Sequence, residues 1–292
     1  MMRGRTLGSD DLVLCAGSLA QVGLFERCRA AARAGFTGVS LFLSDLDQAR
    51  AAGHSDADIR AMLEGHGLAV AELDPLLSWV EGSGVSAGGD AAAFAGYSEE
   101  DFLRAADTFG ARSINTALFA SEPVPHEQLV AGFAGLCDRA KQHGLLVHLE
   151  FMPFSQLRDI DSALSIVEEA GRDNGGLMFD VWHHFRGAGS DSTLRRAAPR
   201  VTATQLDDAP SQAEADLVVE TLHRRLLPGE GDAGVAGLIR LLDEGGCTAP
   251  LGVEVFQDSL VGLPAAEVAK RLFEATRAVV AEARAGTSRA RG

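Results

Sequence analysis

The chain has 292 residues, of which 46% are hydrophobic and 23% charged, a composition that excludes a disordered protein. Its 26 basic residues against 41 acidic ones give a formal net charge of −15, which disfavours nucleic acid and anionic membranes as partners. The cysteines lie far apart, the first residues are charged rather than apolar, and no apolar run is long enough to cross a bilayer. We therefore expect a reduced, cytoplasmic protein.

Short apolar runs alternate with amphipathic segments along the whole chain, and several amphipathic segments end at glycine. Continuous apolar runs are typical of strands in a parallel sheet that is buried on both faces. The predicted strands are Leu12–Cys15, Gly38–Phe42, Ala69–Leu73, Ser113–Ala117, Leu145–Phe151, Gly176–Val181, Val201–Leu206 and Leu251–Phe256. The predicted helices are Phe25–Ala34, Asp56–His66, Glu99–Phe109, His126–His143, Ile160–Ala170, Val235–Glu244 and Ala265–Ala285.

Eight strand and helix repeats within 292 residues predict a (β/α)8 TIM barrel that forms a single domain over residues 1–292. A doubly wound parallel sheet is the alternative, and both folds place the active site at the carboxyl ends of the strands. Residues 83–95 are rich in glycine and alanine and predict a loop insertion, while residues 287–292 predict a frayed tail.

Four polar residues stand within the apolar runs of the last four predicted strands: Glu150, Asp180, Gln205 and Glu254. A single carboxylate at a strand end is more often a helix cap or an ion-pair partner. A buried one is usually paired, protonated or bound to metal, because desolvating it alone costs several kcal/mol. Four in register would converge on the barrel axis. Three carboxylates and an amide oxygen predict one divalent ion, with Mn²⁺ or Mg²⁺ favoured over Co²⁺ or Zn²⁺.

Other polar and aromatic residues lie next to these positions. His183 stands where the sixth strand turns into its loop, and it could be a ligand, a proton shuttle, an orienter of substrate or a structural histidine. Trp182 either walls a pocket or packs in the core. Arg225 could bind a carboxylate, phosphate or hydroxyl group of a substrate, or it could form ion pairs with Glu230 and Asp232.

Two further patterns point to chemistries that we do not predict. Gly229-x-Gly231-x-x-Gly234 matches the dinucleotide-binding fingerprint, but Pro228 and two arginines precede it where that motif requires a strand. Schiff-base chemistry needs a lysine in the site, whereas the lysines of this chain, Lys141 and Lys270, both fall in predicted helices.

Together, Glu150, the Asp180-x-x-His183 pair, Gln205 and Glu254 resemble the metal site of the xylose isomerase-like TIM-barrel superfamily. That superfamily includes sugar and sugar-phosphate isomerases and epimerases, inosose-processing enzymes and endonuclease IV. The resemblance implies a barrel with one catalytic divalent metal. In its epimerase members, the glutamates that match Glu150 and Glu254 bind the metal and also exchange the substrate proton.

The chain departs from most epimerase members at Gln205, where they have histidine. This glutamine and three segments are similar to the 3-dehydroshikimate dehydratase branch, in which the histidine that matches His183 is implicated in catalysis. The segments are Gln205-Leu206-x-Asp208-Ala209-Pro210, Arg225-Leu226-x-Pro228-Gly229-x-Gly231 and Glu254-Val255-Phe256-x-Asp258.

Both branches begin with removal of a proton from carbon next to a carbonyl, a step that a metal and a positioned base accelerate. We expect a metal-dependent sugar or sugar-phosphate isomerase or epimerase that acts on a small polyhydroxylated ketone. Glu150, Glu254 and His183 are the expected catalytic residues, and Arg225 and Trp182 are expected to bind the substrate.

A dehydratase of the 3-dehydroshikimate type is the alternative reading. A DNA repair nuclease and a non-catalytic binding barrel are less favoured, the former because strand-end histidines are few and the charge is negative. The sequence leaves open whether the chain forms a homo-oligomer.

Overall fold

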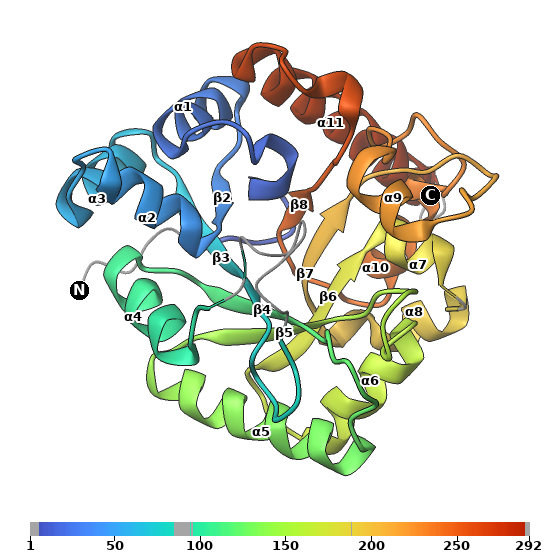
Figure 1. Cartoon of the computed structure of the whole chain (residues 1–292). Coiled ribbons are helices and arrows are strands. Elements are labelled where there is room, and N and C mark those ends of the chain that lie inside the picture. The colour runs from blue at the N-terminus through green and yellow to red at the C-terminus, as the bar shows by residue number, and fades with distance from the viewer. Residues whose placement is uncertain (1–5, 85–93, 95, 188, 290–292) are drawn as a thin grey trace.

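The computed structural model describes residues 6–84, 94, 96–187 and 189–289, so most of the insertion expected over 83–95 lies outside the described residues. Eight parallel strands pair in chain order and close into a barrel, because β1 pairs with both β2 and β8 (Figure 1). Closure confirms the (β/α)8 fold and excludes the doubly wound sheet, whose edge strands would stay open. The strands are β1 Leu12–Leu14, β2 Gly38–Leu41, β3 Ala69–Leu76, β4 Ser113–Ala117, β5 Leu146–Glu150, β6 Gly175–Asp180, β7 Val201–Leu206 and β8 Leu251–Val253.

Helices surround the barrel, and α11 packs against α1 and α10 where the two ends of the barrel sequence meet (Figure 1). Within the described ranges, no helix is both long and apolar enough to cross a membrane. The α-helices are α1 Leu24–Ala34, α2 Leu43–Ala51, α3 Asp56–Gly65, α4 Glu99–Phe109, α5 His126–Gln142, α6 Ile160–Ala170, α7 Val181–Arg186, α8 Asp191–Ala197, α9 Leu217–His223, α10 Val235–Glu244 and α11 Ala265–Arg289. Short 3₁₀ helices are η1 Ala16–Leu19, η3 Ala198–Arg200 and η4 Asp258–Leu260.

Local sequence explains several helix boundaries. Ser55 and Ser98 precede α3 and α4, and each hydroxyl accepts a hydrogen bond from the backbone N–H of the aspartate three residues on. The carboxylates of Asp58 and Asp101 in turn accept from the serine N–H groups, which completes a capping box in both helices. At its other end α4 stops at Gly110, whose φ of 66° lies in the left-handed region.

The boundaries differ from the sequence prediction in a few places. β3 continues to Leu76 instead of ending at Leu73, and β8 ends at Val253 instead of Phe256. The helices α2, α7, α8 and α9 were not predicted, because they are short or follow a strand without a polar turn. The helix α11 runs to Arg289, through part of the expected tail, and residues 290–292 lie outside the described residues.

An extra residue in β3 directs acidic side chains into the barrel. Val39 of β2 pairs with Val70, but the next residue of β2 pairs with Glu72, so Ala71 is left without a partner. A bulge of this kind re-aims the side chains that follow it. Beyond the bulge, Glu72 and Asp74 share one face of the strand, because alternate residues point the same way.

A second extra residue, in β7, decides which side chain stands beside Asp180. Pairing between β6 and β7 skips Thr202, and Asp180 then lies opposite Gln205. With uninterrupted pairing, Asp180 would lie opposite Thr204. The register of β7 therefore brings an amide rather than a hydroxyl to the end of β6.

The interior of the barrel changes character along its axis. At the amino ends of the strands, Leu7, Val13 and Ala71 form a small apolar cluster. Toward the carboxyl ends the buried side chains become polar and include Glu72, Asn115 and many others. The main apolar core lies between the strands and the surrounding helices. The barrel therefore buries its charged groups at the end where TIM barrels carry their active sites.

Candidate active site

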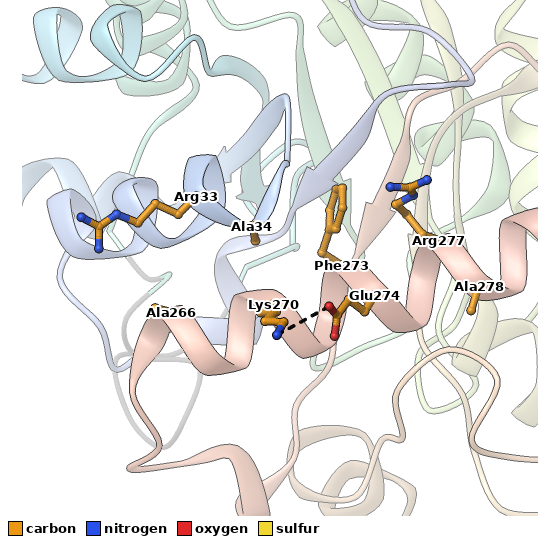
Figure 2. A pocket seen from close by; sticks show the side chains of 8 residues that line it. All are labelled: Arg33, Ala34, Ala266, Lys270, Phe273, Glu274, Arg277 and Ala278. Carbon is orange, nitrogen blue, oxygen red and sulfur yellow. Dashed lines mark ion pairs between the residues drawn. The ribbon is translucent and has the colours of Figure 1, made fainter.

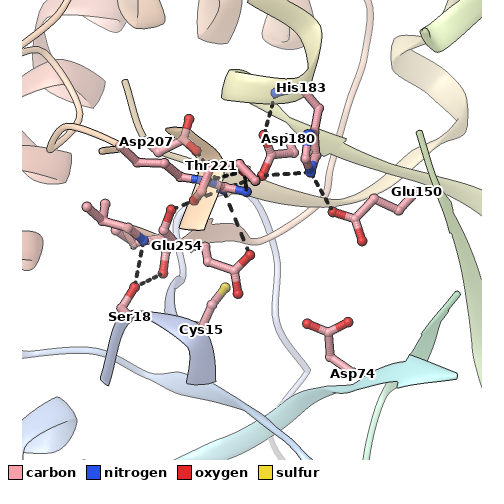
Figure 3. A network of polar contacts seen from close by, with 12 residues as sticks. Cys15, Ser18, Asp74, Glu150, Asp180, His183, Asp207, Thr221 and Glu254 are labelled. Carbon is pink, nitrogen blue, oxygen red and sulfur yellow. Dashed lines mark hydrogen bonds and ion pairs between the residues drawn. The ribbon is translucent and has the colours of Figure 1, made fainter. Parts of the chain in front are cut away.

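Three predicted residues come together at the carboxyl ends of β5 and β6. Glu150, Asp180 and His183 are buried, and one ligand atom from each lies within 4.8 Å of the others. His183 Nε2 is 3.4 Å from Glu150 Oε1 and 4.0 Å from Asp180 Oδ2 (Figure 3). Two carboxylates and an imidazole at this spacing could hold a divalent ion.

The turn from β6 into α7 explains why Asp180 and His183 are neighbours. Asp180 ends β6 and also caps α7, since its Oδ1 accepts a hydrogen bond of 2.7 Å from the backbone N–H of His183. The other carboxylate oxygen of Asp180, Oδ2, faces the interior of the site, where it accepts a hydrogen bond from Arg225. One turn therefore delivers a carboxylate oxygen and an imidazole to the same place.

Gln205 offers a donor atom without a partner. It lies opposite Asp180 in the sheet, only 1% of its surface is exposed, and its Oε1 is buried without a hydrogen bond. A buried amide oxygen without a partner costs free energy, which a bound cation would recover. The residues present therefore fit a divalent metal at this position.

Glu254 stands on the other side of the site, just beyond the end of β8. Its carboxylate is 3.9 Å from Arg225 Nη1 and is not part of the three-residue cluster. Burial raises the pKa of Glu254 well above its usual range, and the charge of Asp74 raises it further. Ser18 of η1 fixes the backbone here, because its hydroxyl donates to the Val253 carbonyl and accepts from the Val255 N–H.

Arg225 is buried in the site, with 3% of its surface exposed. Its Nη1 donates to Asp180 Oδ2 and Asp207 Oδ2 at 2.7 Å each, and its Nη2 donates to Thr221 Oγ1 at 2.8 Å. Although burial opposes the charged form, these carboxylates raise the pKa of Arg225. Its ion-pair partners are thus aspartates of β6 and of the segment after β7, rather than Glu230 and Asp232.

Asp74 and Asn115 complete the site from β3 and β4. Asn115 Nδ2 donates to Asp74 Oδ1 at 2.8 Å and to Glu150 Oε2 at 2.7 Å, and so links the two carboxylates. Burial, followed by the charge of Glu150, raises the pKa of Asp74 from 3.8 to about 7. In Figure 3 the Asp74 side chain points toward the space between Glu150 and Glu254.

The glycine-rich segment before α10, residues 229–234, forms a loop that packs against the candidate site. The Asp208 carboxylate accepts hydrogen bonds from the backbone N–H groups of Gly229 and Ala233. A Cβ on Gly231 would lie 2.4 Å from the Ala209 carbonyl oxygen. Asp208 and Leu226 also exchange backbone hydrogen bonds. These contacts hold the loop against the end of β7 and place Arg225 beneath it.

Aromatic side chains pack around His183. The rings of Phe154 and Trp182 meet the imidazole edge-on, with centroids 5.9 and 5.3 Å away. Trp182 has no exposed surface, and its indole N–H donates to Glu220 at 3.0 Å. Trp182 therefore supports His183 and Arg225 from behind, while Phe154 belongs to a partly buried apolar group with Phe94 and Phe119.

Comparison with known proteins places this geometry in a family. The profile of the xylose isomerase-like TIM-barrel family matches residues 28–279. The chain belongs to the xylose isomerase-like TIM-barrel family. This membership confirms the resemblance noted from the strand-end residues.

Curated relatives within this family share part of the chain. An inosose isomerase of Bacillus velezensis is 31% identical over 150 residues, which are 50% of this chain and 52% of that protein. A 3-dehydroshikimate dehydratase of Pseudomonas aeruginosa is 28% identical over 131 residues, 44% of this chain and 20% of that protein. The chain thus spans about half the length of the isomerase it matches and a fifth of the dehydratase.

Among solved structures, the zinc-bound IOLI protein superposes with a TM-score of 0.78 at 19% identity, over 93% of this chain and 98% of that chain. At this identity the likeness is one of fold.

Sequence reasoning missed Asp74, Asn115 and Asp207 as members of the candidate site. Asp74 lies directly beyond the predicted end of β3, at Leu73, whereas the strand continues to Leu76. Asn115 lies inside a short predicted strand that also contains Ser113 and Thr116, so its polar side chain did not stand out. Asp207 directly follows Leu206, the last residue of the predicted seventh strand.

A separate hollow lies on the outside of the family barrel. A groove of about 550 Å³ between α1 and α11 is lined by Arg33, Lys270, Phe273, Arg277 and neighbouring residues (Figure 2). Lys270 Nζ lies 3.8 Å from Glu274 across one helical turn. None of the strand-end residues lines this groove, so it is distinct from the candidate active site.

Proposed function

We propose that the chain is a divalent-metal-dependent isomerase or epimerase that acts on a small polyhydroxylated ketone through removal of the proton next to the carbonyl. The observation that carries the proposal is the buried group of Glu150, Asp180 and His183, with ligand atoms within 4.8 Å, beside the unpaired Oε1 of Gln205. Membership in the family and the match to inosose isomerases support the reaction class.

In this proposal Glu150, Asp180, Gln205 and Glu254 hold the ion, and His183 lies next to it. Oxygen donors favour Mn²⁺ or Mg²⁺, whereas the nearby imidazole and the zinc of the IOLI structure also admit Co²⁺ or Zn²⁺. When bound, the ion would polarise the substrate carbonyl and stabilise the negative charge that develops on its oxygen.

The protein's own residues would then move the carbon-bound proton. Glu150 and Glu254 approach the site from β5 and β8, so one can remove a proton and the other can return it from another direction. A positioned base of this kind contributes roughly 10²–10⁴-fold to the rate. His183 Nε2 lies 3.4 Å from Glu150 Oε1, and in this proposal His183 would orient a substrate hydroxyl.

The charges of the site favour a neutral substrate. The buried arginine of the site is Arg225, and its charge is already balanced by ion pairs with Asp180 and Asp207. The carboxylate or phosphate of an anionic substrate would meet several acids and no unpaired buried cation among the described site contacts. A neutral polyhydroxylated ketone such as an inosose therefore fits better than a sugar phosphate.

A dehydratase of the 3-dehydroshikimate type is the second candidate. It is supported by the Pseudomonas aeruginosa relative and by the resemblance that rests on Gln205. It would require Arg225 to release one aspartate in order to bind the carboxylate of its substrate.

Incubation of the metal-loaded enzyme with an inosose or with 3-dehydroshikimate in D₂O separates the candidates. We expect solvent deuterium on carbon in an isomeric ketose, loss of the activity on chelation, and recovery with Mn²⁺. The Glu150→Gln enzyme is the matched negative control, because it keeps the size of the side chain and loses the base. An aromatic dihydroxybenzoate product would replace the isomerase by the dehydratase, and no reaction with either compound would refute the proposal.

A further inference from the structure

The short helix α9 is attached to the barrel by polar side chains rather than by an apolar face. The residues of α9 that are buried are Glu220 and Thr221, and both are polar. By contrast, Val218 and Val219 are each 44% exposed. Surface helices of globular proteins usually pack through an apolar stripe. The attachment of α9 beside the candidate site therefore needs an explanation other than apolar packing.

Glu220 is the centre of this attachment, and its side chain has no exposed surface. Its Oε1 accepts hydrogen bonds from Trp182 Nε1 at 3.0 Å and from Arg186 Nε at 2.7 Å. Its Oε2 accepts from the backbone N–H of Glu214 at 2.6 Å. The carboxylate thus ties α9 to α7, the helix that carries both Trp182 and Arg186.

Trp182 connects this anchor to two side chains of the candidate site. The Trp182 ring meets the His183 imidazole edge-on, with centroids 5.3 Å apart, and Arg225 Cζ lies 5.7 Å from the Trp182 ring. Because Glu220 holds the indole N–H, the plane of the ring is held as well, and the imidazole packs against a fixed surface. Thr221, the next residue of α9, accepts a hydrogen bond from Arg225 Nη2.

A purely structural explanation is that the Glu220–Arg186 pair only keeps α9 in place. Burial of an ion pair carries a desolvation cost, and apolar residues of similar size often stabilise a fold equally well or better. An apolar anchor would, however, offer no acceptor to the indole N–H, and a hydrogen bond is directional where an apolar contact is not. The buried carboxylate is therefore better explained by the orientation of Trp182 than by stability.

We infer that Glu220 is a positioning residue of the proposed isomerase and that it acts through Trp182 on the imidazole of His183. The inference rests on the proposed function, in which His183 orients a substrate hydroxyl. The hydrogen bond from Trp182 to Glu220 fixes the indole, and the indole in turn limits the orientations of the imidazole. A displacement of about 1 Å in an active-site group can lower a rate by about 10²-fold, so this restraint affects catalysis directly.

The test compares two changes that affect stability and orientation in opposite ways. Glu220→Gln keeps an oxygen that can accept from the indole N–H, but it removes the charge that balances Arg186, whose side chain is 6% exposed. Glu220→Leu combined with Arg186→Met replaces the ion pair by apolar side chains and leaves the indole N–H without its acceptor. Steady-state kinetics with an inosose give kcat and KM of the Mn²⁺-loaded enzymes, and urea unfolding gives their stability.

For the double variant Glu220→Leu/Arg186→Met we expect a stability close to wild type and a fall in kcat of about 10- to 10²-fold, with a much smaller change in KM. For Glu220→Gln we expect the reverse, a loss of stability with kcat close to wild type. A merely structural role predicts instead that kcat follows stability. The matched control is Arg195→Met with Glu244→Leu, which removes an exposed pair of the same residue types between α8 and α10 and should leave kcat unchanged.

A spectroscopic measurement follows Trp182 itself and needs no substrate. The chain contains two tryptophans, so Trp182 is the one that remains in a Trp79→Phe background. Time-resolved fluorescence anisotropy should show more local motion of the indole in the double variant than in wild type. Glu220→Gln should behave like wild type, because the acceptor of the indole N–H is retained.

Wild-type kcat in the double variant, or an anisotropy decay equal to that of wild type, would overturn the inference and leave the proposed function intact. If the double variant does not fold, Trp182→Phe decides, because it removes the same N–H donor and keeps the ion pair. Its kcat should then fall, and a wild-type value would overturn the inference. A wild-type enzyme that does not convert the inosose refutes the proposed function, whereas the anisotropy decay still decides whether Glu220 holds Trp182.

Discussion

At the scale of single residues, the site is an excess of buried acids held around one buried arginine. The acids are Glu72, Asp74, Glu150, Asp180, Asp207 and Glu254. Arg225 contacts two of them directly and lies 3.9 Å from a third. A buried carboxylate without a cationic partner destabilises the folded state. Arg225, a bound proton and a bound metal ion can each balance such a charge, so we expect one to compensate for the loss of another.

The first prediction follows from the double ion pair of Arg225. In metal-free enzyme, Arg225→Ala should lower the free energy of unfolding by about 3–5 kcal/mol, because two buried aspartates lose their counter-ion. With Mn²⁺ bound the loss should be smaller, since the ion then balances Asp180. Urea unfolding with and without chelator measures both values.

Arg224→Ala is the matched control for this prediction, because Arg224 is the exposed neighbour in the chain. Its effect should stay within about 0.5 kcal/mol. Equal losses for Arg225→Ala with and without Mn²⁺ would show that Asp180 does not exchange the arginine for a metal.

The second prediction concerns the pH dependence that Asp74 gives to the metal-free protein. Its pKa is raised on folding from 3.8 to about 7, so the folded state binds more protons than the unfolded state in this range. Its contribution to stability is therefore full below pH 3.8 and is lost as the pH rises to about 7 and above. In chelator, Asp74→Asn should flatten the fall in stability between pH 5 and 8, as measured by urea unfolding. A wild-type slope in the variant would contradict the assignment.

At the scale of elements, close backbone approaches set the position of the catalytic side chains. Gly17 of η1 packs under Glu254 and Phe256, and a Cβ there would lie 2.6 Å from Glu254 Oε1 and 2.3 Å from the Phe256 ring. The 3₁₀ helix η1 therefore approaches the end of β8 so closely that only the hydrogen atom of a glycine side chain fits between them at position 17.

The third prediction is that Gly17→Ala lowers ketose formation and Mn²⁺ affinity without removing any functional group, because the methyl group must displace Glu254. Gly23→Ala is the control, as no atom lies within 4 Å of a Cβ at that position. Steady-state kinetics and a Mn²⁺ titration measure both effects. If Gly17→Ala matched Gly23→Ala in both, Glu254 would not need its present position.

At the scale of the whole molecule, barrel closure gathers acids from strands that are distant in the sequence. Burial raises the pKa values of Glu72, Asp207 and Glu254 as well as that of Asp74. Each such group opposes folding more strongly as it loses its proton, so the metal-free barrel should weaken as the pH rises.

The fourth prediction is that a divalent ion reverses this loss. A ligand that binds only the folded state stabilises it by about 2.7 kcal/mol at a hundred times its Kd. The rise in Tm on adding Mn²⁺ should be larger at pH 8 than at pH 5.5, because the acids must lose their protons to bind it. Calorimetry at both pH values measures the rise, and Glu150→Gln should reduce it. A rise that is independent of pH would speak against acids as ligands.

Much of the fold could be predicted from the sequence because its signals are local. Apolar runs, amphipathic segments and helix-ending glycines predicted all eight strands and the long helices, and two strands, β4 and β7, were predicted with their observed bounds. The helices that begin directly after a strand, such as α7, were missed, because no glycine or polar turn separates the helix from the strand.

The sequence by itself determined that polar residues, three acids and an amide, would stand at the ends of the last four strands, since repeat order and strand polarity follow from the pattern of apolar residues. Only the tertiary structure decided which atoms meet there. The skipped residue Thr202 puts Gln205 beside Asp180, and the skipped residue Ala71 precedes the inward turn of Asp74. Such register shifts arise from how neighbouring strands fit when the barrel closes. They depend on both strands of a pair, so the sequence of one strand alone does not predict them.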